Sequence, residues 1–238
     1  MWKPYNSLKH KEKYLFKFLS KKHLVDFIGN NDIWFSRADQ FGDKMECVHI
    51  SDLLLDKPNY SEIEKRKRKY LISCWHHADR ETLAFWDTHS KNSEERRIVA
   101  LRFKKDILIQ LFRDWFYMNN SFYIKSEFIH GRVRYGDLIN PHKDVLINYR
   151  IKHPAFRKEG AFGYESEYRF VIKLVMEHSD LGYKYNLRHL SIKDFDILIN
   201  PLLSKIEYLN IKQELIDLGV EESIKPSALF KWLNPEEW

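Results

Sequence analysis

The chain has 238 residues, of which 44% are hydrophobic, so it is long enough and apolar enough to bury a sizeable core. Its net charge of +6, from 40 basic and 34 acidic residues, is more typical of a mildly basic globular protein than of a dedicated nucleic-acid binder. Cys47 and Cys74 form no Cys-x-x-Cys pair, which argues against a disulfide scaffold or a zinc ribbon. No apolar run approaches the roughly 18 residues that span a bilayer, so we expect a soluble cytoplasmic protein without a membrane partner.

Short strands and helices are predicted to alternate in the first half of the chain. Ser20 is typical of a helix N-cap, and Gly29 with the following asparagines ends that helix. Residues 37–46 are expected to form a loop with a turn at Gly42-Asp43. The other predicted elements of this half are strands at 14–18, 33–36, 70–75 and 98–103 and helices at 61–69 and 82–89.

The second half contains the clearest helix, Lys105 to Tyr117, whose apolar residues recur at three- and four-residue spacing. Leu203 to Leu218 is a second amphipathic helix, which ends at Gly219. We also predict strands at 122–124, 128–135, 183–190 and 195–199 and a short helix at 226–233. Because strands and helices are intermixed at irregular spacing, we predict a single α+β domain over residues 1–238, with a mixed, largely antiparallel sheet flanked by amphipathic helices.

The segment Tyr164–Lys173 carries the strongest functional signal. In a strand, the two-residue period of the side chains places Glu165, Glu167 and Arg169 on one face and mainly aromatic and aliphatic residues on the other. A Glu-x-Glu strand can hold a catalytic carboxylate beside one that orients a substrate. It can equally be a ladder of Glu and Arg on a solvated sheet face, and the sequence leaves both interpretations open.

A series of motifs runs through almost the whole chain: Leu15–Phe18, Ile33–Ser36, Phe41–Glu46, Ile72–Trp75, Phe85–Trp86, Val133–Tyr135, Tyr164–Arg169 and Ile197–Pro201. Together they resemble the bacterial family catalogued as domain of unknown function 2971. The usual Phe-Asn-Asp-Pro-Phe-Glu of that family is Phe-Gly-Asp-Lys-Met-Glu here, and its Trp-x-x-Tyr ends in His89. The family has no settled activity, and the resemblance implies a component of a bacterial toxin or defence locus.

The order of polar residues also resembles, more distantly, the plan of ADP-ribosyltransferases, in which a basic residue, a Ser-x-Ser strand and a later Glu surround NAD. This resemblance implies NAD as co-substrate, with Arg37, Ser73 and Arg169 as substrate-binding residues. It implies Glu167 as the carboxylate that stabilises positive charge on the ribose, and Glu165 as the group that activates an acceptor. The alternative for the Arg37 loop is that Asp39 or Asp43 caps a turn.

Other residues each have a functional and a structural interpretation. Trp75 and Trp86 would form an aromatic wall for a base ring, or would simply be core. The basic run Lys65–Lys69 would bind phosphate, or would be a solvated helix face. The histidines show no metal-ligand spacing, so we expect no metal, and no glycine-rich phosphate loop occurs.

The leading hypothesis is therefore an NAD-using enzyme, similar to an ADP-ribosyltransferase or an NAD glycohydrolase, that acts as an effector in a bacterial toxin or anti-phage defence system. The competing hypothesis is a non-enzymatic module of a defence system that binds nucleic acid or a partner protein. The sequence does not specify the oligomeric state.

Overall fold

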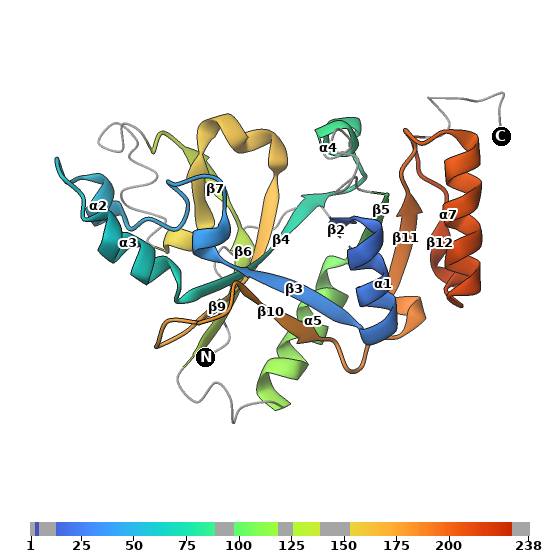
Figure 1. Cartoon of the computed structure of the whole chain (residues 1–238), viewed down its shortest axis with the longest axis horizontal. Helices are drawn as coiled ribbons and strands as arrows, with labels where there is room; N and C mark the ends of the chain where they lie inside the picture. The colour runs from blue at the N-terminus through green and yellow to red at the C-terminus, as the bar shows by residue number, and fades with distance from the viewer. Residues whose placement is uncertain (1–2, 5–12, 89–97, 119–125, 139–152, 230–238) are drawn as a thin grey trace. The chain divides into compact units, whose positions relative to one another are not determined.

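A computed structural model describes residues 3–4, 13–88, 98–118, 126–138 and 153–229 (Figure 1). The chain divides into two compact units. Unit 1 consists of Met1–Lys9, Ile33–Trp75 and Phe116–Tyr185, and unit 2 consists of His10–Asp32, His76–Trp115 and Asn186–Trp238. The predicted α+β class, with a mixed and mostly antiparallel sheet, is confirmed. The prediction of a single domain stays a prediction.

In unit 1, the strand β9 (Glu167–Lys173), which carries Glu167 and Arg169, lies between two other strands of a sheet. The strand order is β1 (Lys3–Pro4), β6 (Glu127–Arg132), β9 and β4 (Tyr70–Ala78), and β3 (Asp32–Arg37) pairs with both β4 and β10 (Gly182–Asn186). β6 and β9 are antiparallel, with Gly131 opposite Arg169. β9 has a strand neighbour on each side, and its residues from Glu167 to Ile172 are buried.

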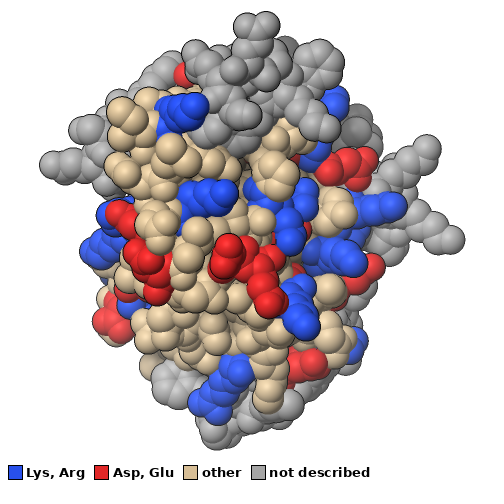
Figure 2. Space-filling view, turned by 90° about the vertical axis from the view of Figure 1, so that its right-hand side faces the viewer, with Lys and Arg blue, Asp and Glu red and all other residues tan. Residues whose placement is uncertain are grey.

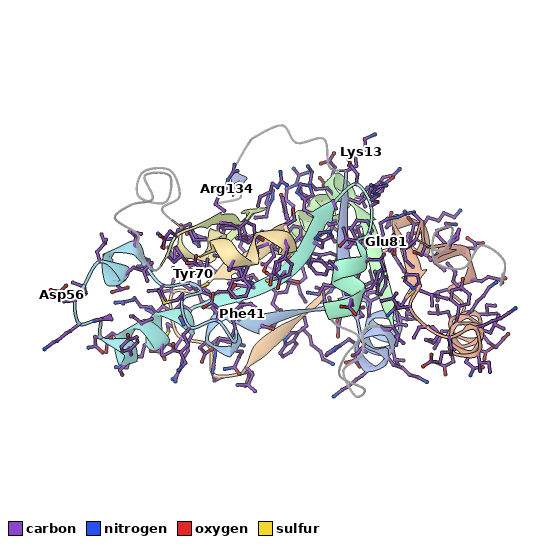
Figure 3. All side chains as sticks on the ribbon, turned by 90° about the horizontal axis from the view of Figure 1, so that it is seen from above. Lys13, Phe41, Asp56, Tyr70, Glu81 and Arg134 are labelled. Atoms are coloured by element: carbon purple, nitrogen blue, oxygen red, sulfur yellow. The ribbon has the colours of Figure 1, made fainter. Side chains whose placement is uncertain are left out.

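Shorter elements of unit 1 lie around this sheet. β7 (Arg134–Gly136) and β8 (Arg157–Glu159) form a separate parallel pair. The helices are η1 (Ala38–Gln40), α2 (Ile50–Leu53), α3 (Tyr60–Lys67), η2 (Pro154–Phe156) and η3 (Gly160–Glu165). Tyr70, Ile72, Ala155 and Val171 are among the residues of the unit 1 core, and Phe41 packs against it; Figure 3 shows Phe41 and Tyr70.

Unit 2 is organised around an antiparallel sheet with an aromatic core. Residues 76–78 of β4 are followed across the sheet by β2 (Tyr14–Leu19), β5 (Val99–Lys104), β11 (Phe195–Ile199) and β12 (Ile224–Lys225), of which only the last pair is parallel among the described strands. Phe16, Phe18 and Trp86 lie in one buried cluster, and Phe27, Phe103 and Phe195 pack edge-to-face or stacked in unit 2 as well.

The helices of unit 2 show clear sequence signals at their ends. α1 (Lys21–Asn30) begins after Ser20 as predicted and ends at Asn31, which adopts the left-handed conformation that a C-terminal cap requires. α7 (Lys205–Asp217) begins with a capping box formed by Ser204 and Glu207. The remaining elements are α4 (Leu83–Thr88), α5 (Lys105–Met118), η4 (Ile192–Asp194) and η5 (Glu221–Ser223). None of the described helices has both the length and the apolar stretch that crossing a bilayer requires.

Several predicted boundaries were wrong. β9 begins at Glu167 instead of Tyr164, because residues 160–165 form η3 and Ser166 has a left-handed φ of 45°. The predicted strand at 183–190 is β10, which stops at Asn186, and the predicted strand at 128–135 is divided at Val133, whose amide donates to the Glu167 carbonyl. Residues 226–229 form no helix; residues 230–233 and the predicted strand at 122–124 lie outside the described residues.

Candidate active site: a buried carboxyl cluster

Lys158 lies at the centre of a charged cluster in unit 1. Its Nζ is 2.5 Å from Glu165 Oε2, 2.9 Å from Glu167 Oε1 and 3.2 Å from Glu46 Oε1. The Lys158 side chain is 10% exposed, and the ring of Phe162 lies over its ammonium with the ring centre 4.7 Å away. A single ammonium group thus holds three carboxyl groups, two from the stretch Glu165–Glu167 and the third, Glu46, from a distant part of the sequence.

Arg169 forms the second positive charge of the cluster and is completely buried. Its Nε donates to Glu167 Oε2 over 2.6 Å, and its Nη2 donates to Glu46 Oε1 over 2.6 Å. Its Nη1 donates to the Ala155 carbonyl over 2.9 Å. Both oxygens of Glu167 are therefore engaged, one by Lys158 and one by Arg169.

The backbone around Glu167 is fixed by a tyrosine and by a tight turn. The amide of Glu167 donates to the Tyr135 hydroxyl over 2.8 Å, which joins the start of β9 to β7. Ser166, in the left-handed conformation, separates η3 from β9. This turn lets Glu165 reach the same ammonium as Glu167, although the two residues do not lie on one strand face.

The cluster shifts the pKa values of the two glutamates of the Glu-x-Glu motif in opposite directions. Burial is the largest effect on Glu165 and, together with its hydrogen bond to Glu167, raises its pKa from 4.5 to about 7, although Lys158 opposes the shift. Burial also acts to raise the pKa of Glu167, but Arg169, the hydrogen bond from Glu165 and Lys158 outweigh it and lower that pKa well below 4.5. Near neutral pH, Glu165 therefore exchanges a proton while Glu167 stays ionised.

Accessibility also distinguishes the two glutamates. The side chain of Glu165 is 20% exposed, whereas those of Glu167 and Glu46 are 9% and 2% exposed. Glu165 is thus the carboxyl group of the cluster that solvent reaches most, and it has the pKa best suited to proton transfer at neutral pH. Of the two interpretations of this segment, the charge ladder on a solvated sheet face does not fit, because the side chains of Glu167 and Arg169 are buried.

Arg37, predicted as a substrate-binding residue, has partners in a different part of unit 1. Its guanidinium forms two hydrogen bonds with the carboxylate of Asp39, at 2.6 and 2.9 Å, and donates to the carbonyls of His178 and Ser179. Burial opposes ionisation of Asp39, but these hydrogen bonds with Arg37 lower its pKa. Arg37 therefore fastens the connection between β9 and β10, while the turn-capping role falls to Asp43, which accepts from the Met45 amide.

The other predicted substrate-binding residues are buried in the cores of the units. Ser73 lies on β4 and accepts a hydrogen bond from Trp75 Nε1 over 3.2 Å, and the Trp75 ring packs edge-on against Phe170. Trp86 belongs to unit 2, where its Nε1 donates to Glu81 Oε2 over 2.9 Å. Both tryptophans are at most 2% exposed, which favours the core interpretation over an aromatic wall.

The basic run Lys65–Lys69 is largely paired with acids. Lys65 contacts Glu62, Arg66 contacts Asp52, and Arg68 lies near Asp39 and Glu177. Lys67 is buried and donates to the Lys44 carbonyl. On the face shown in Figure 2, likewise, Lys and Arg side chains lie interspersed with Asp and Glu. These contacts favour a solubilising helix over a phosphate-binding patch.

Metal ligation is not indicated by the part of the chain that the structure describes. Within it, no three His, Cys, Asp or Glu side chains gather in the way that metal ligands do. In the carboxyl cluster, the Lys158 ammonium takes the central position between three carboxyl groups. His76, His77 and His130 are buried and His153 is partly buried, and His89 and His142 lie outside the described residues.

Comparison with known proteins returns no relative. No protein-family model, no curated protein and no solved structure matches this chain. The resemblances to domain of unknown function 2971 and to ADP-ribosyltransferases therefore stay predictions, and the assignment of function depends on the geometry of the cluster.

Sequence reasoning found Glu165, Glu167 and Arg169 but missed the residues that join them. Glu46 was present in the motif Phe41–Glu46 without an assigned partner, and Lys158 was not singled out. The signal that was available is chemical: two buried glutamates beside one arginine leave a negative charge that requires a second cation. Which of the 40 Lys and Arg residues supplies this cation depends on the fold. The residue is Lys158 on β8, a strand of three residues that is too short to show a side-chain period in the sequence.

Proposed function

We propose that unit 1 is an NAD-using enzyme in which Glu165 acts as the general base for cleavage of the nicotinamide–ribose bond. The observation that carries the proposal is the pair Glu165 and Glu167, two carboxyl groups bound to one ammonium, of which Glu165 is partly exposed and Glu167 is enclosed by Lys158 and Arg169. Burial raises the pKa of Glu165, and the two cations lower the pKa of Glu167. Carboxyl groups whose environments separate their pKa values in this way are typical of acid–base sites, including those that cleave glycosidic bonds.

The chemistry of NAD suits a base more than an acid. When the bond between the ribose C1′ and the nicotinamide nitrogen breaks, its electron pair leaves with nicotinamide, which departs as a neutral molecule and needs no proton. A water molecule forms the new C1′–O bond and gives up a proton to the Glu165 carboxylate, so the products are ADP-ribose and nicotinamide. In a transferase reaction, an acceptor nucleophile takes the place of water.

The remaining residues of the cluster act on Glu165 and are positioning residues in this proposal. Glu167 is enclosed by Lys158 and Arg169, so it fixes the ammonium beside Glu165 and keeps a negative charge next to it. Lys158 holds Glu165 in place over 2.5 Å. Consumption of NAD by such a site agrees with the toxin or defence setting expected from the family resemblance.

The competing function, binding of nucleic acid, has less support. Its main sequence signal was the run Lys65–Lys69, and the basic groups of residues 65–68 are engaged by carboxylates or by backbone. Salt-dependent binding requires basic groups that are available to replace phosphate counterions. We therefore place the enzyme ahead of the binding module.

The direct test is incubation of the purified full-length chain with NAD, with nicotinamide release followed by proton NMR. We expect release by the wild type and a loss of about 100-fold or more in Glu165→Gln, which keeps the shape of the side chain but removes the base. The rate should rise with pH through about 7, because only the ionised form of Glu165 accepts a proton.

The matched control is Glu62→Gln, which removes an exposed carboxylate from unit 1 that pairs only with Lys65 among the described residues. Its rate of nicotinamide release should equal that of the wild type. Absence of nicotinamide release by folded wild-type protein, or full activity in Glu165→Gln, contradicts the proposal.

A further inference from the structure

Glu46 reaches the carboxyl pair from a segment that has no other part in the proposed reaction. It lies at the end of the motif Phe41–Glu46, where its backbone amide donates to the Asp43 carbonyl. Its side chain is 2% exposed, and its Oε1 contacts both cations of the cluster, Arg169 at 2.6 Å and Lys158 at 3.2 Å. One oxygen atom thus connects the two positive charges that hold Glu165 and Glu167.

We propose that Glu46 is a positioning residue that acts through Lys158 and decides how readily Glu165 gives up its proton. This inference rests on the proposed role of Glu165 as a base. It gives the Phe41–Glu46 segment a role in setting the protonation of Glu165, although no residue of that segment takes part in the proposed reaction.

The physical argument is a balance of charge around one ammonium group. Lys158 is shared among three carboxyl groups, so its attraction for Glu165 is reduced by each of the others. Glu46 also competes with Glu167 for Arg169, and its negative charge lies near Glu165 in an enclosed site where charges are poorly screened. Both effects favour the protonated form of Glu165.

The charged and titratable groups around Glu165 come from four elements of unit 1. Lys158 on β8 and Glu167 on β9 bond to Glu165, and Tyr135 on β7 interacts with it. Arg169 on β9 and Glu46 at the end of its loop act on it through Lys158 and Glu167. The two basic groups are each held by Glu167 as well as by Glu46. Removing the charge of Glu46 therefore leaves both cations in place, and it frees Lys158 to stabilise ionised Glu165 and Arg169 to neutralise Glu167 more fully.

The experiment is a carbon-13 NMR titration of the full-length chain labelled at the carboxyl carbons of Glu, with Glu165 assigned from Glu165→Gln. In Glu46→Gln, we expect the titration midpoint of Glu165 to fall by about one pH unit. The rise of NAD cleavage with pH should move in the same direction by the same amount, which a merely structural role would not produce.

Two variants serve as controls. Glu46→Asp keeps the charge and should restore a midpoint close to that of the wild type, and Glu62→Gln removes a distant exposed carboxylate and should leave the midpoint unchanged. An unshifted Glu165 midpoint in folded Glu46→Gln overturns the inference.

A measurement on the wild type covers the case in which Glu46→Gln does not fold. The Glu46 carboxyl resonance should move with the same midpoint as Glu165 between about pH 5 and 9, because both groups bind one ammonium. A Glu46 resonance that stays constant over that range overturns the inference. The NMR midpoints can be measured without enzymatic activity. Failure of the inference therefore appears as unchanged midpoints, whereas failure of the proposed function appears as absent nicotinamide release.

Discussion

Each unit of this protein buries carboxyl groups, but in very different ways. In unit 2, Glu81 is 3% exposed, and each of its oxygens accepts one neutral donor, the Trp86 ring nitrogen and the Ala228 amide, both over 2.9 Å. In unit 1, three carboxyl groups are gathered around Lys158 and Arg169.

The difference shows that a buried carboxyl group can be satisfied by neutral donors alone, without a cluster of charges. Two well-placed N–H groups are enough to satisfy the buried Glu81, which joins the segment before α4 to the segment after β12; Figure 3 shows Glu81. The cluster of unit 1 is costlier, because removing several charges from water is offset only by good mutual geometry. It also produces a glutamate whose pKa is raised to about 7. We infer that unit 1 retains this arrangement for chemistry.

The largest expected effect on stability comes from removing the buried guanidinium of unit 1. Arg169→Ala leaves Glu46 and Glu167 enclosed with one cation fewer, so we expect a loss of about 3–5 kcal/mol in the free energy of unfolding. Urea denaturation followed by circular dichroism measures this loss.

Lys173→Ala on the same strand is the matched control for Arg169→Ala. Lys173 is 42% exposed and pairs with Glu127 at 3.4 Å, so its removal should change stability by about 0.5 kcal/mol or less. Equal losses in the two variants would show that the cluster contributes no more than a surface ion pair.

A smaller effect concerns the pH dependence of stability. The pKa of Glu165 is raised in the folded state from 4.5 to about 7, so the folded protein holds a proton that the unfolded chain has released. The contribution of Glu165 to the free energy of unfolding is complete below about pH 4.5 and is lost as pH rises through 7. Between these values, wild-type stability should fall by about 2–3 kcal/mol relative to Glu165→Gln.

Parallel urea titrations of the two proteins at several pH values measure that difference. Glu167 has the opposite sign: its lowered pKa makes its contribution complete above about pH 4.5 and lost at lower pH. If the stability difference between wild type and Glu165→Gln stays constant from pH 4.5 to 7, Glu165 does not hold its proton in the folded state.

The smallest expected effect is in unit 2. In Glu81→Gln, the new amide NH2 group faces an N–H group that donated a hydrogen bond to the Glu81 carboxylate. We therefore expect a loss of about 1–2 kcal/mol in the free energy of unfolding. Nicotinamide release per folded molecule should be unchanged. A loss of that activity would mean that the buried carboxylate of unit 2 has a part in catalysis and that the two units do not differ in this respect.

Local signals in the sequence were enough for most elements. The spacing of apolar residues identified α5, and the left-handed cap at Asn31 ends α1 as the Asn pair predicted. The two-residue period correctly placed Glu167 and Arg169 on one face of β9, where they form an ion pair. The same rule failed for Glu165, because Ser166 interrupts the strand with a positive φ that no local pattern signals.

The sequence by itself determined the α+β class, most helix and strand positions and the polar character of the Glu-x-Glu segment, because these depend on side-chain periods and caps within a few residues. Only the tertiary structure decided that Glu46 and Lys158 join that segment, and that Arg37, Ser73 and Trp86 have other partners. Electrostatic contacts between segments separated by more than 100 residues, such as Glu46 with Arg169, leave no periodic trace in the chain. They arise when burial forces charges to find partners, and that pairing raises the pKa of one glutamate and lowers that of its neighbour.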